Sequence, residues 1–556
     1  SIDFIENGTT SPAVQNVSFM ASRGKLTAIV GESGSGKTAT ALSILGLLPQ
    51  SAKVSGEILF SADETRRFKL NGLPENALKN IRGNQVSMIF QEPMTSLNPV
   101  LTCGFQVMES LITHKKLTRK DARAETIRIF EQVELPEPAS MIGRYPHEIS
   151  GGQKQRVMIA MAMSCKPDLL IADEPTTALD VRMQRNILQL IKKLQQSNNM
   201  AVLLITHDLG LVTDVADEII VMYKGRIVEQ GNAVTILNEP QHPYTKALLS
   251  CRPVSVQKGI KLPMLQDFLT DKTFVKHDVL KEKIVTPKEN INEPALSVKQ
   301  LKVYFPMNRN IFGRPGSYFK AVDDVSFDIG QSETIGLVGE SGCGKTTLGR
   351  AILRLIKPTE GKILLDGKDI TNVSTSESRL MARQLQIVFQ DPYGSLNPRI
   401  SIGKAILEPL MVHKLHTNNK ERKEVVIDTL EKVQLQADHY KRFPHQFSGG
   451  QRQRICIARA LILNPSFLVF DESVSALDVS VQAGILNLVN ELKAAYHFTS
   501  IFISHDLAVV HYISDRILVM REGKIIEEGK ADDIYFHPKM EYTKQLIEAI
   551  PGGRLN

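Results

Sequence analysis

The sequence has few cysteines and no long apolar run. Its five cysteines include no CxxC pair, which argues against a disulfide framework and a structural zinc site. No stretch approaches 18 uninterrupted apolar residues, so none is expected to span a bilayer. The start, SIDFIENGTTSP, lacks the basic and apolar regions of a signal peptide. It also lacks Met, and we expect further residues upstream. A reducing cytoplasm is the simplest location, with any membrane role supplied by partners. The cysteines are Cys103, Cys165, Cys251, Cys343 and Cys456.

A strong excess of one charge is also missing. The chain has 67 Lys and Arg against 60 Asp and Glu, a formal charge of +7, and no long basic run. This balance gives little support for a nucleic acid or an anionic lipid as partner. With 556 residues, 42% hydrophobic and 23% charged, the chain resembles an ordinary soluble protein that is too long for one core. Two to four domains are expected.

The sequence contains an internal repeat. GESGSGKT at 31–38 returns as GESGCGKT at 339–346, an offset of 308 residues. The SGGQ segments that begin at 150 and 448 are 298 residues apart, and later matches keep this offset. The change of the offset from 308 to 298 predicts a duplicated domain with a loop insertion early in the first copy, within FSADETRRFKLNGLPENA. We expect one domain at 1–250, a polar, Pro-interrupted linker at 251–293 and a second domain at 294–556.

Local patterns predict an α/β nucleotide-binding core in each half. The apolar runs KLTAIVG and ETIGLVG lead into the Gly-rich loops, and apolar residues at helical spacing follow them. LLIADE, AVLLITHD, SFLVFDE and SIFISHD read as further strands whose carboxyl ends carry acidic residues or His.

The Gly-rich loops fit the GxxxxGK[ST] pattern, in which backbone N–H groups surround a polyphosphate at a helix N-terminus. We expect Lys37 and Lys345 to reach the β and γ phosphates, and the Thr38 and Thr346 hydroxyls to bind Mg²⁺. A chance Gly-rich turn is the alternative, and two matches in the same context make it remote. The predicted nucleotide ligands are Gly31, Ser33, Gly34, Ser35, Gly36, Lys37 and Thr38, with Gly339, Ser341, Gly342, Cys343, Gly344, Lys345 and Thr346.

Each half also carries an acidic pair, a His and a Gln. The acidic pairs Asp173-Glu174 and Asp471-Glu472 follow apolar runs, so one carboxylate could hold Mg²⁺ and the next could polarise water. The His residues could contact the γ-phosphate, and the Gln amides could reach metal and water. Each of these residues alone would be weak evidence. The prediction depends on their recurrence at matching positions after both Gly-rich loops. The predicted catalytic residues are Glu174, Glu472, His207, His505, Gln91 and Gln390, and the predicted metal ligands are Thr38, Gln91, Asp173, Thr346, Gln390 and Asp471.

The SGGQ segments, each followed by small and apolar residues, predict a second anion site at a helix N-terminus. Since each half already has a phosphate loop, this second site is useful if it closes over the nucleotide of the other half. The residues are Ser150, Gly151, Gly152 and Gln153, with Ser448, Gly449, Gly450 and Gln451.

This ordered set of motifs, with ALD at 178–180 and 476–478, resembles two nucleotide-binding domains of ATP-binding cassette (ABC) proteins in tandem. The resemblance covers nearly the whole chain. It implies two P-loop NTPase domains, each with a RecA-like core and a helical subdomain, in a head-to-tail pair around two ATP. Lys37 and Thr38 would then face Ser448 and Gly450, and the second loop would face Ser150 and Gly152. The resemblance also implies that Glu174 and Glu472 act as bases and that Asp180 and Asp478 communicate between sites.

In this family adenine usually stacks on an aromatic side chain before the phosphate loop. Phe4 is the candidate of the first half. In the second half the choice stays open, and local packing is the plainer reading for most of these rings. The candidates there are Tyr304, Phe305, Tyr318 and Phe319.

FQEPMTSLNP and FQDPYGSLNP, with the tails HPYTKALL and HPKMEYTKQLI, resemble fused ATPases of peptide-type importers. Members of that group serve dipeptides, oligopeptides, glutathione or microcin C, and nickel carriers are related. The resemblance implies an ATPase that drives two transmembrane permease subunits from the cytoplasmic face of the bacterial inner membrane, with an extracytoplasmic substrate-binding protein. We expect no nucleic acid partner.

Two alternatives remain open at this point. A soluble twin-cassette ATPase could act on ribosomes or DNA, although the linker does not resemble the long charged helix of the ribosomal type. A nonhydrolysing regulator is disfavoured by two intact catalytic sets.

Many unfused relatives bind an iron-sulfur cluster after the HPYT segment, but Cys251 stands alone here, so we expect none. Ser473 replaces Pro175 and Cys343 replaces Ser35; both sites nevertheless keep their carboxylates, and we expect both to hydrolyse ATP.

Overall fold

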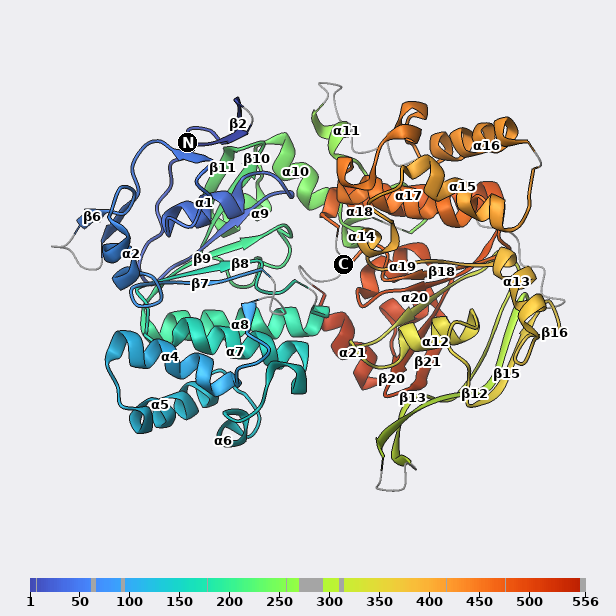
Figure 1. The fold of residues 1–556 in the computed structure, drawn as a ribbon, viewed down its shortest axis with the longest axis horizontal. Helices are drawn as coiled ribbons and strands as arrows, with labels where there is room; N and C mark the ends of the chain where they lie inside the picture. Colours follow the sequence, from blue (N-terminus) through green and yellow to red (C-terminus); the bar gives the residue numbers. More distant parts are fainter. Residues whose placement is uncertain are drawn as a thin grey trace. The chain divides into compact units, whose positions relative to one another are not determined.

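The computed structural model divides the chain into two units, Ser1–Leu249 and Ser250–Asn556 (Figure 1). Residues 251–256 and 258–269 of the predicted linker group with the second unit, and residues 270–293 lie outside the described residues. The structure describes residues 1–6, 8–61, 67–91, 96–177, 179–256, 258–269, 294–309, 315–416, 418–475 and 477–550.

The first unit is built on a six-stranded sheet in the order β11-β10-β3-β9-β8-β7. All pairs are parallel except β10 with β11. Strands β3, β8 and β9 are buried along their whole length, as expected for parallel strands covered on both faces. The strands predicted from KLTAIVG, LLIADE and AVLLITHD are thus confirmed. The bounds are β3 (Leu26–Val30), β7 (Val86–Ile89), β8 (Leu169–Asp173), β9 (Ala201–Thr206), β10 (Glu218–Tyr223) and β11 (Arg226–Asn232).

A smaller antiparallel sheet, in the order β2-β1-β4, and the hairpin β5-β6 complete the strands described in this unit. The expected insertion falls at this hairpin, and its residues 62–66 lie outside the described part. The bounds are β1 (Ile2–Glu6), β2 (Thr9–Val14), β4 (Ala52–Val54), β5 (Leu59–Ser61) and β6 (Arg67–Lys69).

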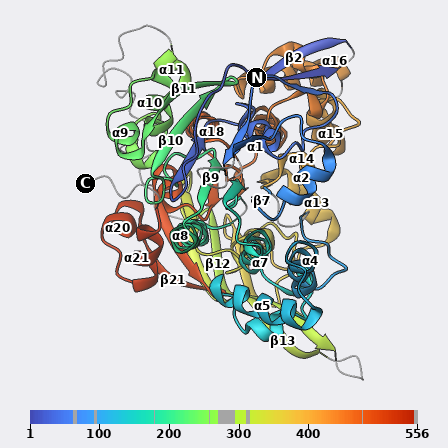
Figure 2. The ribbon, with the colours of Figure 1, turned by 90° about the vertical axis from the view of Figure 1, so that its left-hand side faces the viewer.

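The helix α1 follows β3 directly, as the phosphate-loop pattern predicts. The helices α4, α5 and α7 pack on one another and form a helical subdomain to one side of the sheet (Figure 2). The bounds are α1 (Lys37–Ile44), α2 (Glu75–Ile81), α4 (Cys103–Lys115), α5 (Arg119–Gln132), α6 (Pro138–Met141), η1 (Pro146–Glu148), α7 (Gly151–Met163), α8 (Val181–Asn198), α9 (Ala233–Asn238) and α10 (Pro243–Ser250).

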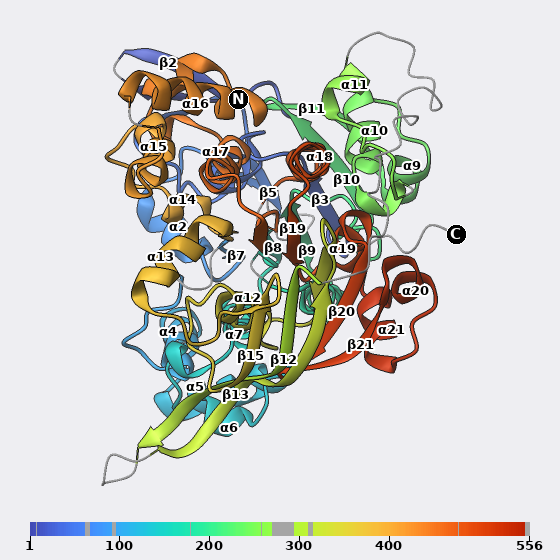
Figure 3. The same ribbon diagram turned by 90° about the vertical axis from the view of Figure 1, so that its right-hand side faces the viewer.

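The second unit repeats this architecture. Its six-stranded sheet has the order β17-β18-β19-β14-β20-β21, which matches the first sheet strand for strand. Its antiparallel sheet has the order β13-β12-β15-β16, and β12 and β13 form a long hairpin (Figure 3). The bounds are β12 (Leu296–Arg309), β13 (Pro315–Ile329), β14 (Thr334–Val338), β15 (Glu360–Leu365), β16 (Lys368–Asp369), β17 (Leu385–Val388), β18 (Phe467–Asp471), β19 (Thr499–Ile503), β20 (Arg516–Arg521) and β21 (Lys524–Lys530).

The helices of the second unit also follow the first, with α12 after the phosphate loop and α15, α16 and α17 as the helical subdomain. One exception is α19, because the matching residues 209–215 of the first unit form turns. The bounds are η2 (Pro253–Ser255), α11 (Leu265–Leu269), α12 (Lys345–Ile352), α13 (Thr375–Gln384), α14 (Pro392–Ser395), α15 (Ile402–Val412), α16 (Asn419–Lys432), η3 (Ala437–Lys441), η4 (Pro444–Gln446), α17 (Gly449–Leu461), α18 (Val479–Tyr496), α19 (Leu507–Ile513), α20 (Ala531–Phe536) and α21 (Glu541–Glu548).

Among the described residues, no helix combines the length and apolar character needed to cross a membrane.

Candidate functional site

Each phosphate loop depends on glycines that no other residue could replace without strain. Gly36 and Gly344, at the start of α1 and α12, have φ of 96° and 109°. A Cβ at these positions would lie 2.8 Å from the Ala13 carbonyl oxygen and 2.0 Å from that of Ala321. Each loop is therefore pressed against a strand of the antiparallel sheet, β2 in the first unit and β13 in the second, and only glycine fits there.

The loop lysines are buried and hold the loops in shape. Lys37 Nζ donates to the carbonyl oxygens of Gly31 at 2.6 Å and Glu32 at 2.9 Å. Lys345 Nζ makes the matching bonds to Gly339 at 2.8 Å and Glu340 at 2.9 Å. A phosphate oxygen could replace these carbonyls as acceptor, since an ammonium group has three donors.

A hydroxyl and a carboxylate meet next to each loop. Thr38 Oγ1 donates to Asp173 Oδ1 at 3.2 Å, and Thr346 Oγ1 donates to Asp471 Oδ1 at 2.9 Å. Burial raises the pKa of Asp173 to about 6, and it raises the pKa of Asp471 as well. A hydroxyl oxygen beside a buried carboxylate is the ligand type that Mg²⁺ prefers.

The glutamate after each of these aspartates has an unusual backbone conformation. Glu174 and Glu472 have φ of 47° and 48°, in the left-handed region that costs a non-glycine residue energy. The amide of each is held by the neighbouring strand, with Glu174 N donating to Ile205 O at 2.9 Å. Such strain persists where the surroundings fix it, and its repetition in both units marks the two carboxylates as functional candidates.

The predicted Gln and His converge on these glutamates. Gln91 Nε2 donates to Glu174 Oε2 at 3.1 Å, and His207 Nδ1 lies 3.3 Å from the same oxygen. In the second unit, Gln390 Nε2 donates to Glu472 Oε2 at 3.0 Å, and His505 Nδ1 lies 3.6 Å from it. The structure therefore brings together, within each unit, side chains that are far apart in the sequence.

The charge of each glutamate is stabilised by its neighbours. Burial alone would raise the pKa of Glu174, but the hydrogen bond and charge of His207, with the charge of Lys37, outweigh it and lower the pKa below its usual value. The pKa of Glu472 is lowered in the same way by His505 and Lys345, against burial. Both carboxylates are thus ionised near neutral pH, as a group that accepts a proton or orients water must be.

The SGGQ segments begin helices, as predicted. Ser150 is the N-cap of α7: its side chain accepts from Gln153 N at 3.3 Å, and Gln153 Oε1 accepts from Ser150 N at 3.0 Å. Ser448 and Gln451 form the same capping box at α17, which leaves the first turn well ordered. At the second glycine of each segment a Cβ would meet Met183 Cε in the first unit or Val481 Cγ1 in the second at 2.2 Å, and the flexible Met183 can move away more easily than the β-branched Val481. The two glycines are Gly152 and Gly450.

The aspartates of the ALD motifs also lie at helix N-termini. Asp180 is the N-cap of α8 and accepts from Met183 N at 2.9 Å, whereas Asp478 begins α18 without a side-chain cap bond. Ala178 and Ala476 of these motifs lie outside the described residues.

Two tyrosines that the sequence analysis did not assign contact the phosphate loops. The Tyr244 hydroxyl, on α10, accepts from Glu32 N at 2.9 Å, and the Tyr542 hydroxyl, on α21, accepts from Glu340 N at 3.0 Å. Tyr244 is fully buried and Tyr542 nearly so. The signal was present in the sequence, because both tyrosines belong to the HPYT and MEYT tails at the same offset of 298 residues.

The strand register separates the candidate adenine-binding rings. Val303 pairs with Val322 as Ile2 pairs with Val14, so Phe305 takes the place of Phe4, two residues further along the same face. Tyr304 lies on the opposite face, where its hydroxyl donates to Asp323 and Lys320 lies 5.3 Å from its ring. Tyr318 and Phe319, on the partner strand, are about half exposed.

Comparison with known proteins agrees with this arrangement. The ABC transporter family model matches residues 14–177 and 322–475, which together make up more than half of the chain. The chain belongs to the ABC transporter family. The model of the oligopeptide/dipeptide transporter C-terminal region matches residues 228–270 and 526–554, the two segments that carry Tyr244 and Tyr542. As a member of this family the chain is an ATP-binding ATPase, and ATP hydrolysis powers transport.

The similar curated proteins include two glutathione import ATP-binding proteins called GsiA. The one from Pectobacterium atrosepticum is 45% identical over 554 residues, covering 99% of this chain and 88% of the relative. The one from Salmonella typhimurium is 45% identical over 555 residues, with the same coverage. Among solved structures, the dimeric ATP-binding cassette MJ0796 bound to ADP and Pi is 27% identical over 42% of this chain and 98% of its own, with a TM-score of 0.38. Full-length similarity to transporter subunits favours the transport reading and gives no support to a ribosomal or DNA-directed role.

Proposed function

We propose that this ATPase drives the import of small peptides, with glutathione or short peptides as cargo, through two separate membrane permease subunits. The observation that carries the proposal is the pair of complete catalytic sets, each tied by a tail tyrosine to a segment typical of oligopeptide and dipeptide transporters. The full-length similarity to glutathione import proteins supports the same cargo class.

Each unit would hold one ATP with Mg²⁺. The metal would be held by Thr38, Asp173 and Gln91 in the first unit and by Thr346, Asp471 and Gln390 in the second. It would neutralise charge on the phosphates. The contact between each hydroxyl and its buried carboxylate supports this assignment. The lysines and the loop N–H groups bind the phosphates, while Glu174 and Glu472 orient and deprotonate water. His207 and His505, each beside its glutamate, would contact the γ-phosphate and hold the water and the glutamate in line.

Each ATP would be completed by the other unit. Each SGGQ helix presents N–H groups and the positive end of its dipole, and each unit already has a loop for one nucleotide. In this proposal the first loop would be paired with Ser448 and Gly450, and the second loop with Ser150 and Gly152. Asp180 and Asp478 lie at the starts of helices that follow the catalytic carboxylates, which suits a role in communication between the sites.

Adenine would stack on Phe4 in the first unit and on Phe305 in the second. The matched register supports this choice. Tyr304 is held on the other face of its strand by Asp323, so we do not assign it to adenine stacking.

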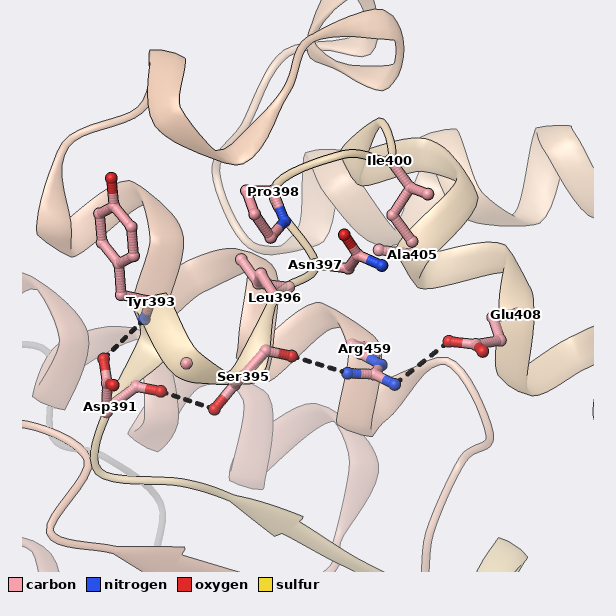
Figure 4. Close-up of a pocket in the computed structure, with 11 residues that line it drawn as sticks. Asp391, Tyr393, Ser395, Leu396, Asn397, Pro398, Ile400, Ala405, Glu408 and Arg459 are labelled. Atoms are coloured by element: carbon pink, nitrogen blue, oxygen red, sulfur yellow. Dashed lines mark hydrogen bonds and ion pairs between the residues drawn. The ribbon is translucent and has the colours of Figure 1, made fainter.

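A permease segment would dock in a cavity of about 560 Å³ in the second unit (Figure 4). The cavity is lined by the loop that directly follows Gln390 and by α15 and α17. Arg459 crosses it, donating to Ser395 O at 3.0 Å and pairing with Glu408 at 3.2 Å. Because Gln390 contacts Glu472, a partner seated here could sense the state of the catalytic carboxylate.

The chain would act on the cytoplasmic face of the inner membrane, held there by the permease subunits, with a substrate-binding protein delivering cargo on the other side. No nucleic acid partner and no iron-sulfur cluster are proposed.

The test is uptake by vesicles that contain the chain and its copurified permease subunits. With ATP inside and the binding protein outside, labelled glutathione or a labelled dipeptide should accumulate, and the Glu174→Gln, Glu472→Gln double variant should abolish uptake. Accumulation of neither class, in vesicles that hydrolyse ATP, would reject the peptide cargo while leaving the ATPase intact.

A further inference from the structure

The start of the predicted linker is bound to the helices next to the second catalytic His. We call residues 258–264 the strap. Leu262 N donates to Asn487 Oδ1 at 2.9 Å, and Asn487 Nδ2 donates back to Leu262 O at 2.8 Å. These two bonds fix the strap backbone on α18, and Leu262 itself is fully buried.

The strap also binds α19, the helix that begins two residues after His505. The Tyr512 hydroxyl donates to Ile260 O at 2.9 Å, and Lys258 Nζ donates to Ser514 O at the end of the helix. At its other end α19 is capped by Asp506, which accepts from Ala508 N at 2.9 Å. The helix α19 is thus held at both ends. His505 directly precedes Asp506, the residue that caps the N-terminal end.

Among the described residues, the first unit shows no matching contacts. At the offset of 298 residues, Asn487 corresponds to Gln189, which is exposed, and Tyr512 corresponds to Asp214, which pairs with Arg185 at 3.4 Å. The residues that match α19 form turns, with Thr213 N bonded to Gly210 O at 3.3 Å. Within the described part of the chain, the strap contacts and the helix therefore occur together, in the second unit.

We propose that the strap is a positioning element for His505. It holds α19 as a helix and thereby fixes the approach of the imidazole to Glu472. Asn487 and Tyr512 are positioning residues, since they contact the strap and not the reacting groups. The strap follows α10 in the sequence, and Tyr244 of α10 contacts the first phosphate loop. This inference rests on the proposed ATPase sites.

The experiment uses the full chain carrying Glu174→Gln, so that single-turnover hydrolysis reports the second site. Asn487→Leu and Tyr512→Phe are each expected to lower the rate of the hydrolytic step about fivefold, while the concentration of ATP for half-maximal rate changes less than twofold. Deuterium exchange should become faster at the strap and at α19. Gln189→Leu, the same change at the matching position, should alter neither. The Asn487 and Tyr512 variants should leave the first site unchanged when Glu472→Gln is the background.

Three results would overturn the proposal: faster exchange at the strap with an unchanged hydrolytic rate, an equal loss in both backgrounds, or unchanged exchange in both variants. The unsubstituted chain is measured first, and an absence of ATP hydrolysis there would reject the proposed function instead.

Discussion

His207 and His505 contact matched glutamates, yet the chain that follows each histidine is organised differently. After His207 the backbone runs through turns, and after His505 it forms α19, held by Asp506 and by the strap. A duplicated domain can therefore keep its reacting side chains while the support around them diverges. In the second unit this support comes from the strap, which lies in the predicted linker between the domains. A comparison of motifs alone therefore does not reveal it.

The surroundings of the buried aspartates differ in the same way. Arg350 Nη2 lies 3.7 Å from Asp471 Oδ2 in the second unit, and the matching residue of the first unit is Leu42. The positive charge of Arg350 opposes the effect of burial on the pKa of Asp471. No arginine acts on the pKa of Asp173, which burial raises to about 6. Two sites with the same Thr and Asp thus differ in their electrostatics.

The largest expected effect tests whether the two sites share one chemistry. Because the proposed cycle uses both sites, Glu174→Gln or Glu472→Gln alone should lower steady-state ATP turnover about a hundredfold or more, the range of a lost general base, although the other site can still complete a single turnover. Phosphate release by the purified complex measures this. Nearly full turnover in one variant would mean that the two units do not hydrolyse ATP alike.

A second prediction concerns adenine binding in the second unit. Phe305→Ala should weaken ATP binding at that site about tenfold, because it removes the proposed stacking surface. Tyr304→Ala is the matched control and should change affinity less than twofold. Equilibrium binding of ATP is measured on the chain carrying Lys37→Ala. Because this substitution weakens the first site, the measured affinity reports the second site. A larger loss for Tyr304→Ala would reverse the assignment.

The tail tyrosines should have equal effects in the two units. Tyr244→Phe or Tyr542→Phe leaves one buried N–H of the phosphate loop without its acceptor, at a cost of about 1–3 kcal/mol. Since part of this cost can be relieved when the loop moves, we expect about a fivefold rise in the ATP concentration for half-maximal turnover. Steady-state titration of each variant measures it. If only one of the two substitutions raised the ATP concentration for half-maximal turnover, the two tails would not support the phosphate loops equally.

The smallest effect concerns Arg350. Arg350→Leu gives the second unit the residue of the first and removes a positive charge near the proposed metal site. The Mg²⁺ concentration for half-maximal ATP binding at that site should fall about threefold, a modest change because the guanidinium is partly exposed. A higher requirement for Mg²⁺ would instead assign Arg350 a role in orienting Asp471.

The sequence was sufficient for the repeated architecture and for most of each site. Apolar runs that end in Asp-Glu or His identify buried parallel strands, and the constant offset between Glu174 and Glu472 places the same set twice. The SGGQ segments begin helices because Ser and Gln form capping boxes there.

Other features depend on contacts that no local pattern encodes. Tyr244 reaches Glu32 from more than two hundred residues away, and the polar, Pro-interrupted stretch around Leu262 gave no sign that it binds α18. The choice between Tyr304 and Phe305 needed the strand register, because a shift of one residue exchanges the faces of a strand. The difference between α19 and the turns at 209–215 likewise depends on what packs against them.

The proposed function requires two ATP sites per chain, each completed by both units. The decisive measurement is the number of ATP molecules retained by the purified chain carrying both Glu174→Gln and Glu472→Gln, after rapid removal of free nucleotide in Mg²⁺. Two ATP per chain are predicted, with both released when Ser150 and Ser448 are replaced by arginine. Retention of one ATP, or of two that the arginine substitutions do not release, would contradict the account.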